Sequence, residues 1–245
     1  MGMNVQAKRL DVISNDLANT DTTGYKKDVV AVSSFKEEYI KRLDDYQNFT
    51  PNEGVIGKIT YGAKVDEIYT DFTQGSVIST ANDTDLAIQG EGFFVVQTPD
   101  GEAYTRDGSF TVNQLGELVT SEGYNVMGTE GPISLGEAFF ETGDKVIIKS
   151  DGGIYLGNEY IDTLDIAAFE DTRVLTKMDD NLYSADGERV EFSGKLLQGY
   201  LETSNVNTVD AMVNMITVAR AYETNQKMIQ TMDNVLGKAV NDLGR

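Results

Sequence analysis

The chain contains one glycine pattern with the start of a nucleotide-binding motif. Gly90-Glu91-Gly92 begins like the dinucleotide fingerprint, in which closely spaced glycines let the backbone approach a pyrophosphate. Val95 occupies the position of the third glycine, however, and a strand-like apolar run stands where the fingerprint needs a helix. We therefore interpret the two glycines as a tight turn between strands.

Several acidic stretches have partial metal-binding or catalytic spacing. Asn82-Asp83-Thr84-Asp85 has calcium-like oxygen spacing, but the downstream glycine and glutamate of a calcium loop are missing. We expect a capping or turn role for this stretch, and the same for Asp179-Asp180-Asn181. Glu37/Glu38 and Asp44/Asp45 resemble paired glycosidase carboxylates, but 40 acidic residues produce such pairs by chance. The sequence thus predicts no metal site and no cofactor.

Composition excludes further classes of site. Cysteine and histidine are absent, which removes thiolate nucleophiles, disulfides and the commonest general base and transition-metal ligands. We expect that the protein is not an enzyme and has no small-molecule substrate. An enzyme that uses carboxylates stays open as a third hypothesis. The net charge of −20 argues against nucleic acid and against anionic membrane surfaces. No apolar run approaches the roughly 20 residues of a membrane span, so we expect no direct membrane insertion.

The strongest pattern lies in the last forty residues. Apolar residues alternate there in steps of four and three, and only Asn225 is polar among them: Ala211, Met215, Val218, Tyr222, Asn225, Ile229, Met232, Leu236, Ala239, Leu243. This period of 3.5 residues predicts a long helix with one narrow apolar seam, which is typical of a coiled coil. A single polar residue such as Asn225 can fix the register of such a seam.

The start of the chain predicts a second helix over residues 3–23. Met3, Leu10 and Leu17 are spaced by seven, with Gln6, Ile13 and Thr20 offset from them by three. Gly24 supplies a stop signal, and Asn207 with Asp210 forms a capping-box-like start for the long C-terminal helix. We expect the two terminal helices to pair as a coiled coil.

Short runs rich in β-branched and aromatic residues fill the middle of the chain. Residues 58–65, 92–97, 145–149 and 160–166 read as strands, and Asp-Gly dipeptides at 100–101, 107–108, 151–152 and 186–187 read as turns. Beside one of these turns, Thr105-Arg106-Asp107-Gly108-Ser109-Phe110 predicts a structural salt bridge at a hairpin. The expected fold is therefore α+β and mainly β, with an antiparallel β-rich region between terminal helices.

We expect three parts along the chain. Residues 1–24 and 205–245 form a discontinuous helical domain, and residues 25–130 with 185–204 form the β-rich region. Residues 131–184 are a possible inserted β subdomain, and residues 44–57 are expected to be an exposed loop.

Four stretches, in this order, resemble the flagellar basal-body rod and hook protein family. They are Ser14-Asn-Asp-Leu-Ala-Asn-Thr-Asp-Thr-Thr-Gly-Tyr-Lys26; Asp85-Leu-Ala-Ile-Gln-Gly-Glu-Gly-Phe-Phe-Val95; Tyr104-Thr-Arg-Asp-Gly-Ser-Phe110 with Gly116-Glu-Leu-Val-Thr120; and Gln198-Gly-Tyr-Leu-Glu-Thr-Ser-Asn-Val-Asn207 with the helix that follows. The signature residues within them are Asn15, Leu17, Ala18, Asn19, Gly24, Tyr25, Gly90, Gly92, Phe93, Phe94, Tyr104, Thr105, Arg106, Gly108 and Phe110. The chain length is closest to the rod members of this family.

This resemblance implies a non-enzymatic subunit of the flagellar rod in the basal body, which crosses the cell envelope. It implies self-assembly, contacts with other rod and hook axial proteins, and passage through the flagellar type III export apparatus. The family usually has about ten more residues before Gly2-Met-Asn, so a trimmed, monomeric chain is one expectation. The seam residues expected to form the assembly interface are Leu10, Ile13, Leu17, Met215, Val218, Tyr222, Asn225, Ile229, Met232 and Leu236.

A secreted adhesin or carbohydrate-binding β module with helical ends is the alternative from another functional class. It predicts a binding affinity that resides in the β-rich region and survives deletion of both helices.

Overall fold

The computed structural model of the chain describes residues 2–35, 37–41, 55–136, 139, 145–178 and 181–243. It divides into two compact units. The helical unit consists of residues 1–17, 28–69 and 208–245, and the β body consists of residues 18–27 and 70–207. The acidic pairs Asp44/Asp45 and Asp179/Asp180 lie outside the described residues.

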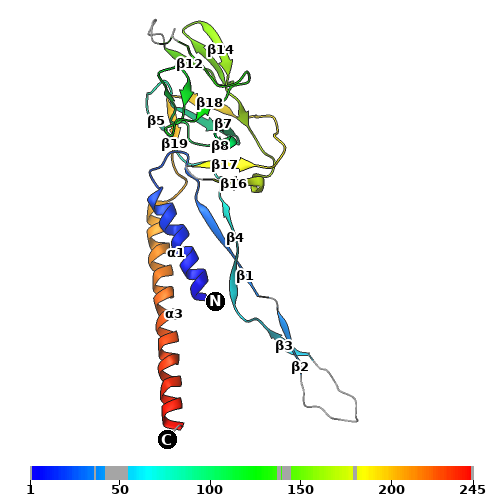
Figure 1. Cartoon of the computed structure of the whole chain (residues 1–245), viewed down its shortest axis with the longest axis vertical. Helices are drawn as coiled ribbons and strands as arrows, with labels where there is room; N and C mark the ends of the chain where they lie inside the picture. Colours follow the sequence, from blue (N-terminus) through cyan, green and yellow to red (C-terminus); the bar gives the residue numbers. More distant parts are fainter. Residues whose placement is uncertain are drawn as a thin grey trace. The chain divides into compact units, whose positions relative to one another are not determined.

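Two long elements dominate the helical unit, α1 (Gly2–Ala18) and α3 (Thr208–Leu243) (Figure 1). α3 begins directly after Asn207, as the capping pattern predicts, and Asp210 places a negative charge in its first turn. Three exposed threonines, Thr217, Thr224 and Thr231, each donate a hydrogen bond of 2.8 Å to the carbonyl four residues earlier. Their hydroxyl groups are thus satisfied within the helix.

The N-terminal helix is shorter than predicted. α1 ends at Ala18 rather than at residue 23, and a turn follows in which the Thr22 backbone N–H donates to the Asn19 carbonyl at 3.3 Å. The Thr22 hydroxyl also donates to the Asn19 side chain at 3.1 Å. Hydroxyl and amide side chains compete in this way with helical hydrogen bonds, which explains the early end.

Two-stranded ribbons complete the helical unit. β1 (Asp28–Ser34) pairs with β4 (Ala63–Thr70), and β2 (Glu38–Lys41) pairs antiparallel with β3 (Val55–Ile59). The predicted strand over residues 58–65 is therefore divided between β3 and β4, with Gly62 at φ 136° between them. β3 also begins inside the predicted loop of residues 44–57.

The β body is built from several antiparallel sheets. The largest has eight strands in the order β16-β17-β8-β7-β11-β10-β9, with β15 also paired to β7. Three strands form the sheet β12-β13-β14, and two pairs, β18-β6 and β19-β5, complete the body (Figure 1). The bounds are β5 (Val77–Ser79), β6 (Leu86–Gln89), β7 (Phe93–Thr98), β8 (Gly101–Thr105), β9 (Thr111–Val112), β10 (Leu118–Val119), β11 (Asn125–Val126), β12 (Val146–Ile148), β13 (Gly153–Leu156), β14 (Glu159–Thr163), β15 (Ile166–Ala167), η1 (Thr172–Val174), β16 (Leu175–Lys177), β17 (Leu182–Ala185), β18 (Lys195–Gln198) and β19 (Tyr200–Glu202).

The central strand β7 is buried on both faces. Phe94 and Val96 point into one apolar cluster, which also contains Leu86, whereas Phe93 and Val95 point into another. Alternate side chains of a strand face opposite sides, so a strand between two cores reads as a continuous apolar run. The predicted hairpin at Asp100-Gly101 is confirmed, because β7 and β8 pair up to Thr98 opposite Gly101.

The structure confirms an α+β, mainly β fold with a helix at each end. Residues of β12–β14 contribute Val146, Ile148, Ile154 and Leu156 to the same core as Leu86. The division at residues 131–184 stays a prediction. Within the described residues, no helix has the length and apolar character that a membrane span requires.

Candidate assembly surfaces and the motif junction

Sequence motifs that lie far apart in the chain meet in the β body, at a place we call the motif junction. The backbone N–H of Gly24 donates to the carbonyl of Glu202 at 2.8 Å. The Thr23 hydroxyl donates to the carboxylate of Asp107 at 2.7 Å, across 84 positions of sequence. The segment that follows α1 is therefore fixed to two later parts of the chain.

Three buried charges form the centre of the motif junction, and we call them the charge cluster: Lys26, Arg106 and Glu202. The Glu202 carboxylate accepts hydrogen bonds from Lys26 Nζ at 2.5 Å, from Arg106 at 3.2 Å and from the Gly75 backbone N–H at 2.8 Å. The three side chains are only 0–3% exposed. Burial lowers the pKa of Lys26 and the pKa of Arg106, and the attraction of the Glu202 carboxylate opposes both shifts.

The two cations of the charge cluster also bind backbone oxygens. Lys26 Nζ donates to the Thr73 carbonyl at 2.8 Å, and Arg106 donates to the Gly90 carbonyl at 2.9 Å. The Arg106 guanidinium also lies 5.1 Å from the centre of the Phe93 ring, within the range of a cation–π contact. Because the three charged groups are buried and bind one another, we assign the cluster a structural role.

The prediction of a local salt bridge within residues 105–110, between Arg106 and Asp107, is wrong. Arg106 pairs with Glu202, whereas Asp107 accepts hydrogen bonds from Thr23 and from the backbone N–H of Ser109 at 3.0 Å. The turn residues thus face two different segments, a long-range arrangement that local sequence does not reveal.

Two glycines of the motif junction leave no room for a side chain. Gly24 has a φ of +66°, and a Cβ there would lie 2.3 Å from the backbone nitrogen of Asp107. A Cβ on Gly108 would lie 1.7 Å from the carbonyl oxygen of Leu86. Glycine is needed at both positions because the backbones approach each other closely.

The signature residues fall into two groups by burial. Those buried are Gly24, Tyr25, Gly92, Phe93, Phe94, Tyr104, Thr105, Arg106, Gly108 and Phe110. Gly90, Leu17 and Asn19 are partly exposed, and Asn15 and Ala18 are exposed.

The Asn82–Asp85 stretch forms a turn in which the Asn82 side chain donates to Asp85 at 3.0 Å. Glu37 forms an exposed ion pair with Lys58.

The seam predicted on α3 is covered along only half of the helix. Ala211 is buried, and four seam residues after it are partly buried: Met215, Val218, Tyr222 and Asn225. From Gln226 to Asn241 every residue is exposed. Ile229, Met232 and Leu236 are 48%, 60% and 63% exposed.

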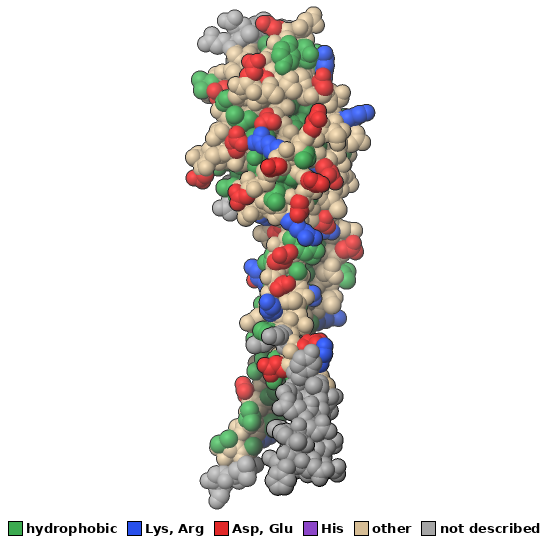
Figure 2. Space-filling view, turned by 90° about the vertical axis from the view of Figure 1, so that its right-hand side faces the viewer, with side chains coloured by type: hydrophobic (Ala, Val, Ile, Leu, Met, Phe, Trp, Pro, Cys, Tyr) green, Lys and Arg blue, Asp and Glu red, His purple; other side chains and the backbone are tan. Residues whose placement is uncertain are grey.

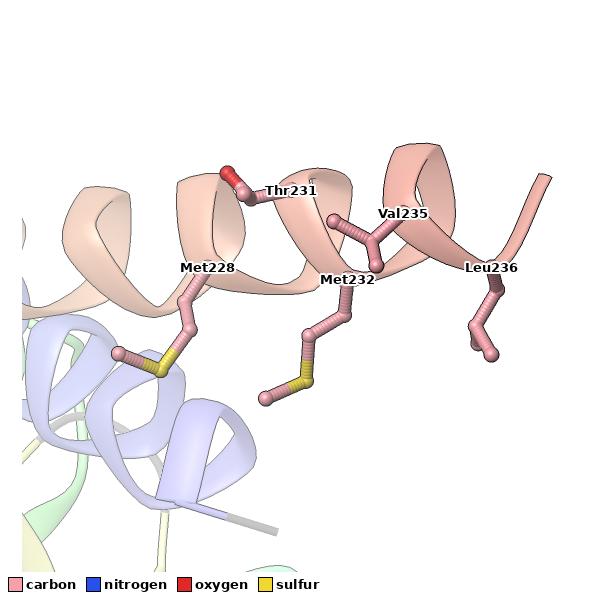
Figure 3. A pocket seen from close by; sticks show the side chains of 5 residues that line it. All are labelled: Met228, Thr231, Met232, Val235 and Leu236. Carbon is pink, nitrogen blue, oxygen red and sulfur yellow. The ribbon is translucent and has the colours of Figure 1, made fainter. Parts of the chain in front are cut away.

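The two terminal helices differ in length. α1 has 17 residues and spans about 25 Å, whereas α3 has 36 residues and spans about 54 Å. Figures 1 and 3 draw α1 beside the first half of α3 and ending near its middle. Leu10, Ile13 and Leu17 of α1 are partly buried, and Val5 is buried. The second half of α3 extends beyond the end of α1.

The exposed second half of α3 carries an apolar surface that we call the C-terminal strip. Its residues are Met228, Ile229, Met232, Val235, Leu236 and Val240, between 48% and 70% exposed. Part of the strip lines a shallow apolar groove, where Met228, Met232 and Leu236 project from the same side of the helix (Figure 3). The sequence prediction missed Met228, Val235 and Val240. Met228 and Val235 are seven residues apart and directly precede the seam residues Ile229 and Leu236, and this spacing is the signal for a wider stripe.

The face of the β body drawn in Figure 2 carries many acidic and few basic side chains, in line with the net charge of −20. Such a surface does not favour binding to phosphate backbones. In the parts of the chain that the structure describes, no group of three or more acidic side chains is placed to hold a metal ion.

Three protein-family models match the chain. The model described as "Flagella basal body rod protein" matches residues 1–26, "Flagellar hook protein FlgE/F/G D1 domain" matches residues 87–156, and "Flagellar basal body rod FlgEFG protein C-terminal" matches residues 197–243. The flagellar basal-body rod protein FlgG of Borreliella burgdorferi is 35% identical over 98% of this chain and 95% of its own length. The chain belongs to the flagellar basal-body rod protein family.

Further relatives agree with this family. The basal-body rod protein FlgF of Caulobacter vibrioides is 32% identical over 97% of this chain and 93% of its own length. The hook-basal body complex protein FlhO of Bacillus subtilis is 29% identical over 99% and 96%. As a member of the rod family, the chain is a structural subunit of the flagellar rod in the basal body. The comparisons give no support to an adhesin.

The charge cluster joins the three regions that the rod-family models match. Lys26 is the last residue of the first region, Arg106 lies in the second and Glu202 in the third. The contacts of Glu202 therefore connect segments from the beginning, the middle and the end of the rod-family sequence.

Proposed function

We propose that this rod subunit assembles helically with further copies of itself through the apolar surface of its terminal helices. The exposed C-terminal strip of α3 is the observation that carries this proposal. Full burial of an Ile, Leu or Met side chain contributes about 1.5–3 kcal/mol, and a side chain that is half exposed contributes about half of that when it is covered. Three residues of the predicted seam, Ile229, Met232 and Leu236, lie in this strip, so neighbouring subunits gain considerable stability by covering it.

Within one subunit, the first half of α3 pairs with α1 as a short antiparallel coiled coil. The partly buried Leu10, Ile13 and Leu17 of α1 supply one side of the seam. Met215, Val218 and Tyr222 supply the other, and Asn225 stands where the covered stretch ends. A polar residue within the seam fixes the register of the two paired helices. The signature residues of the motif junction hold the β body in the fold that carries these helices.

The wider role follows from the rod family. The subunit contacts other axial proteins of the rod and hook, reaches the envelope through the flagellar type III export apparatus and catalyses no reaction. Residues 131–184 complete the β body as an inserted segment, with residues 70–130 and 185–207 around them.

Deletion of the gene tests this proposal. We expect a strain without the gene to be non-motile, with basal bodies that lack a complete rod in electron micrographs, and we expect the wild-type gene to restore both. A deletion strain with normal rods and normal motility contradicts the proposal. An adhesin would instead leave motility intact and retain an affinity in the β body.

A further inference from the structure

α3 carries a second exposed apolar surface, separate from the C-terminal strip, which we call the N-terminal face. It consists of Met212, Val213 and Ile216, which are 49%, 57% and 53% exposed. Successive residues of a helix are rotated by about 100°, so Met212, Ile216 and Val213 lie about 80°, 120° and 180° around the helix from the middle of the seam pair Ala211 and Met215. The seam does not explain it, because the seam side of this half is the side that is buried or partly buried.

The first half of α3 is thus apolar on two sides. A helix that is apolar on more than one side is normally buried on more than one side. Only one of these sides is covered within the chain, since Ala211 is 9% exposed whereas the N-terminal face is about half exposed. The first half of α3 therefore fits between its own α1 and a further apolar partner.

Resting on the proposed self-assembly, we infer that the N-terminal face of one subunit receives the C-terminal strip of the next copy. Identical subunits that form an open helical assembly need two different complementary surfaces, one at each side of the repeated contact. A closed dimer needs only one self-complementary surface. α3 offers two distinct exposed apolar surfaces, at residues 212–216 and 228–240, and a head-to-tail contact covers both on every inner subunit.

Charges beside the two surfaces are compatible with this contact. Arg220 follows Ile216 by four residues and Val213 by seven, so it continues the N-terminal face, and Glu223 lies one turn further on. Asp233 follows Ile229 by four residues and lies at the edge of the C-terminal strip. A head-to-tail contact can place Arg220 of one copy near Asp233 of the next, whereas pairing of two C-terminal strips brings two aspartates together.

Complementation between two variants tests this inference. Ile216→Asp removes the N-terminal face and keeps the C-terminal strip, whereas Met232→Asp does the reverse. We expect each purified full-length variant alone to sediment as a monomer. An equimolar mixture should form a one-to-one heterodimer that grows no further, because each variant supplies the surface that the other lacks. Asn214→Asp and Gln230→Asp, on other sides of the same helix halves, should polymerise like the wild type.

The outcomes separate this inference from the proposed function. A wild-type chain that stays monomeric at every concentration overturns the self-assembly itself, and this contact with it. A wild-type chain that polymerises while the mixture gives no heterodimer overturns the head-to-tail contact alone. Undiminished association of Ile216→Asp has the same meaning, because it shows that the N-terminal face is not used. Circular dichroism of each variant confirms that its fold is retained.

Discussion

Replacing Ile229 by aspartate should abolish self-assembly while the β body stays folded. Ile229 is 48% exposed in the single chain, so the change costs the isolated subunit little. In an assembled rod the same side chain is expected to be covered, and burying an unpaired carboxylate costs several kcal/mol. Since 1.4 kcal/mol is a factor of ten, the concentration needed for assembly should rise at least about a hundredfold. Sedimentation of the purified chain and motility of a complemented strain measure the effect.

Two companion variants make this result specific. Gln230→Asp introduces the same charge at the next position, outside the C-terminal strip, and should assemble normally. Met215→Asp should also stop assembly, but Met215 is partly buried within the chain, so its change also weakens the first half of α3. An Ile229→Asp chain that still polymerises and supports motility shows that the seam is assigned to the wrong surface.

Replacing Glu202 by alanine should destabilise the β body by about 3–5 kcal/mol. The change leaves Lys26 and Arg106 buried without the carboxylate that binds both, and burial already lowers the pKa of each cation. Urea unfolding, followed by circular dichroism of the full chain, measures the loss as a shift of the midpoint.

A surface ion pair of the same unit provides the control. Glu102 pairs with Arg189, and their side chains are 53% and 35% exposed. Exposed pairs contribute about 0–1 kcal/mol, so Glu102→Ala should shift the midpoint only slightly. Equal shifts for Glu202→Ala and Glu102→Ala contradict the structural role of the charge cluster.

The helices were predictable because their determinants are local. The seven-residue repeat predicts a helix through the C-terminal residues, and α3 spans Thr208–Leu243. The repeat does not indicate which part of the seam is covered, because Tyr222 and Ile229 occupy the same position of the seven-residue repeat. Only the three-dimensional structure shows that the first of these residues is partly buried and the second exposed.

The charge cluster was not predictable from local patterns. Lys26 and Glu202 are 176 positions apart, and lysine and glutamate are almost never fully buried unless they are paired. Arg106 stands beside Asp107, so a local salt bridge was the natural prediction, whereas the fold places Glu202 within 3.2 Å of it. The family resemblance marked Arg106 as a signature residue, but not the carboxylate that binds it.

Chemical protection of the C-terminal strip tests assembly through the terminal helices most directly. The chain has no cysteine, so a Leu236→Cys variant carries a single thiol at a position that is 63% exposed. We expect a maleimide reagent to label this thiol rapidly in the free chain and in dissociated rods. In intact basal bodies isolated from a motile strain, we expect the thiol to be protected. Equally rapid labelling of intact rods and free chain would contradict the account.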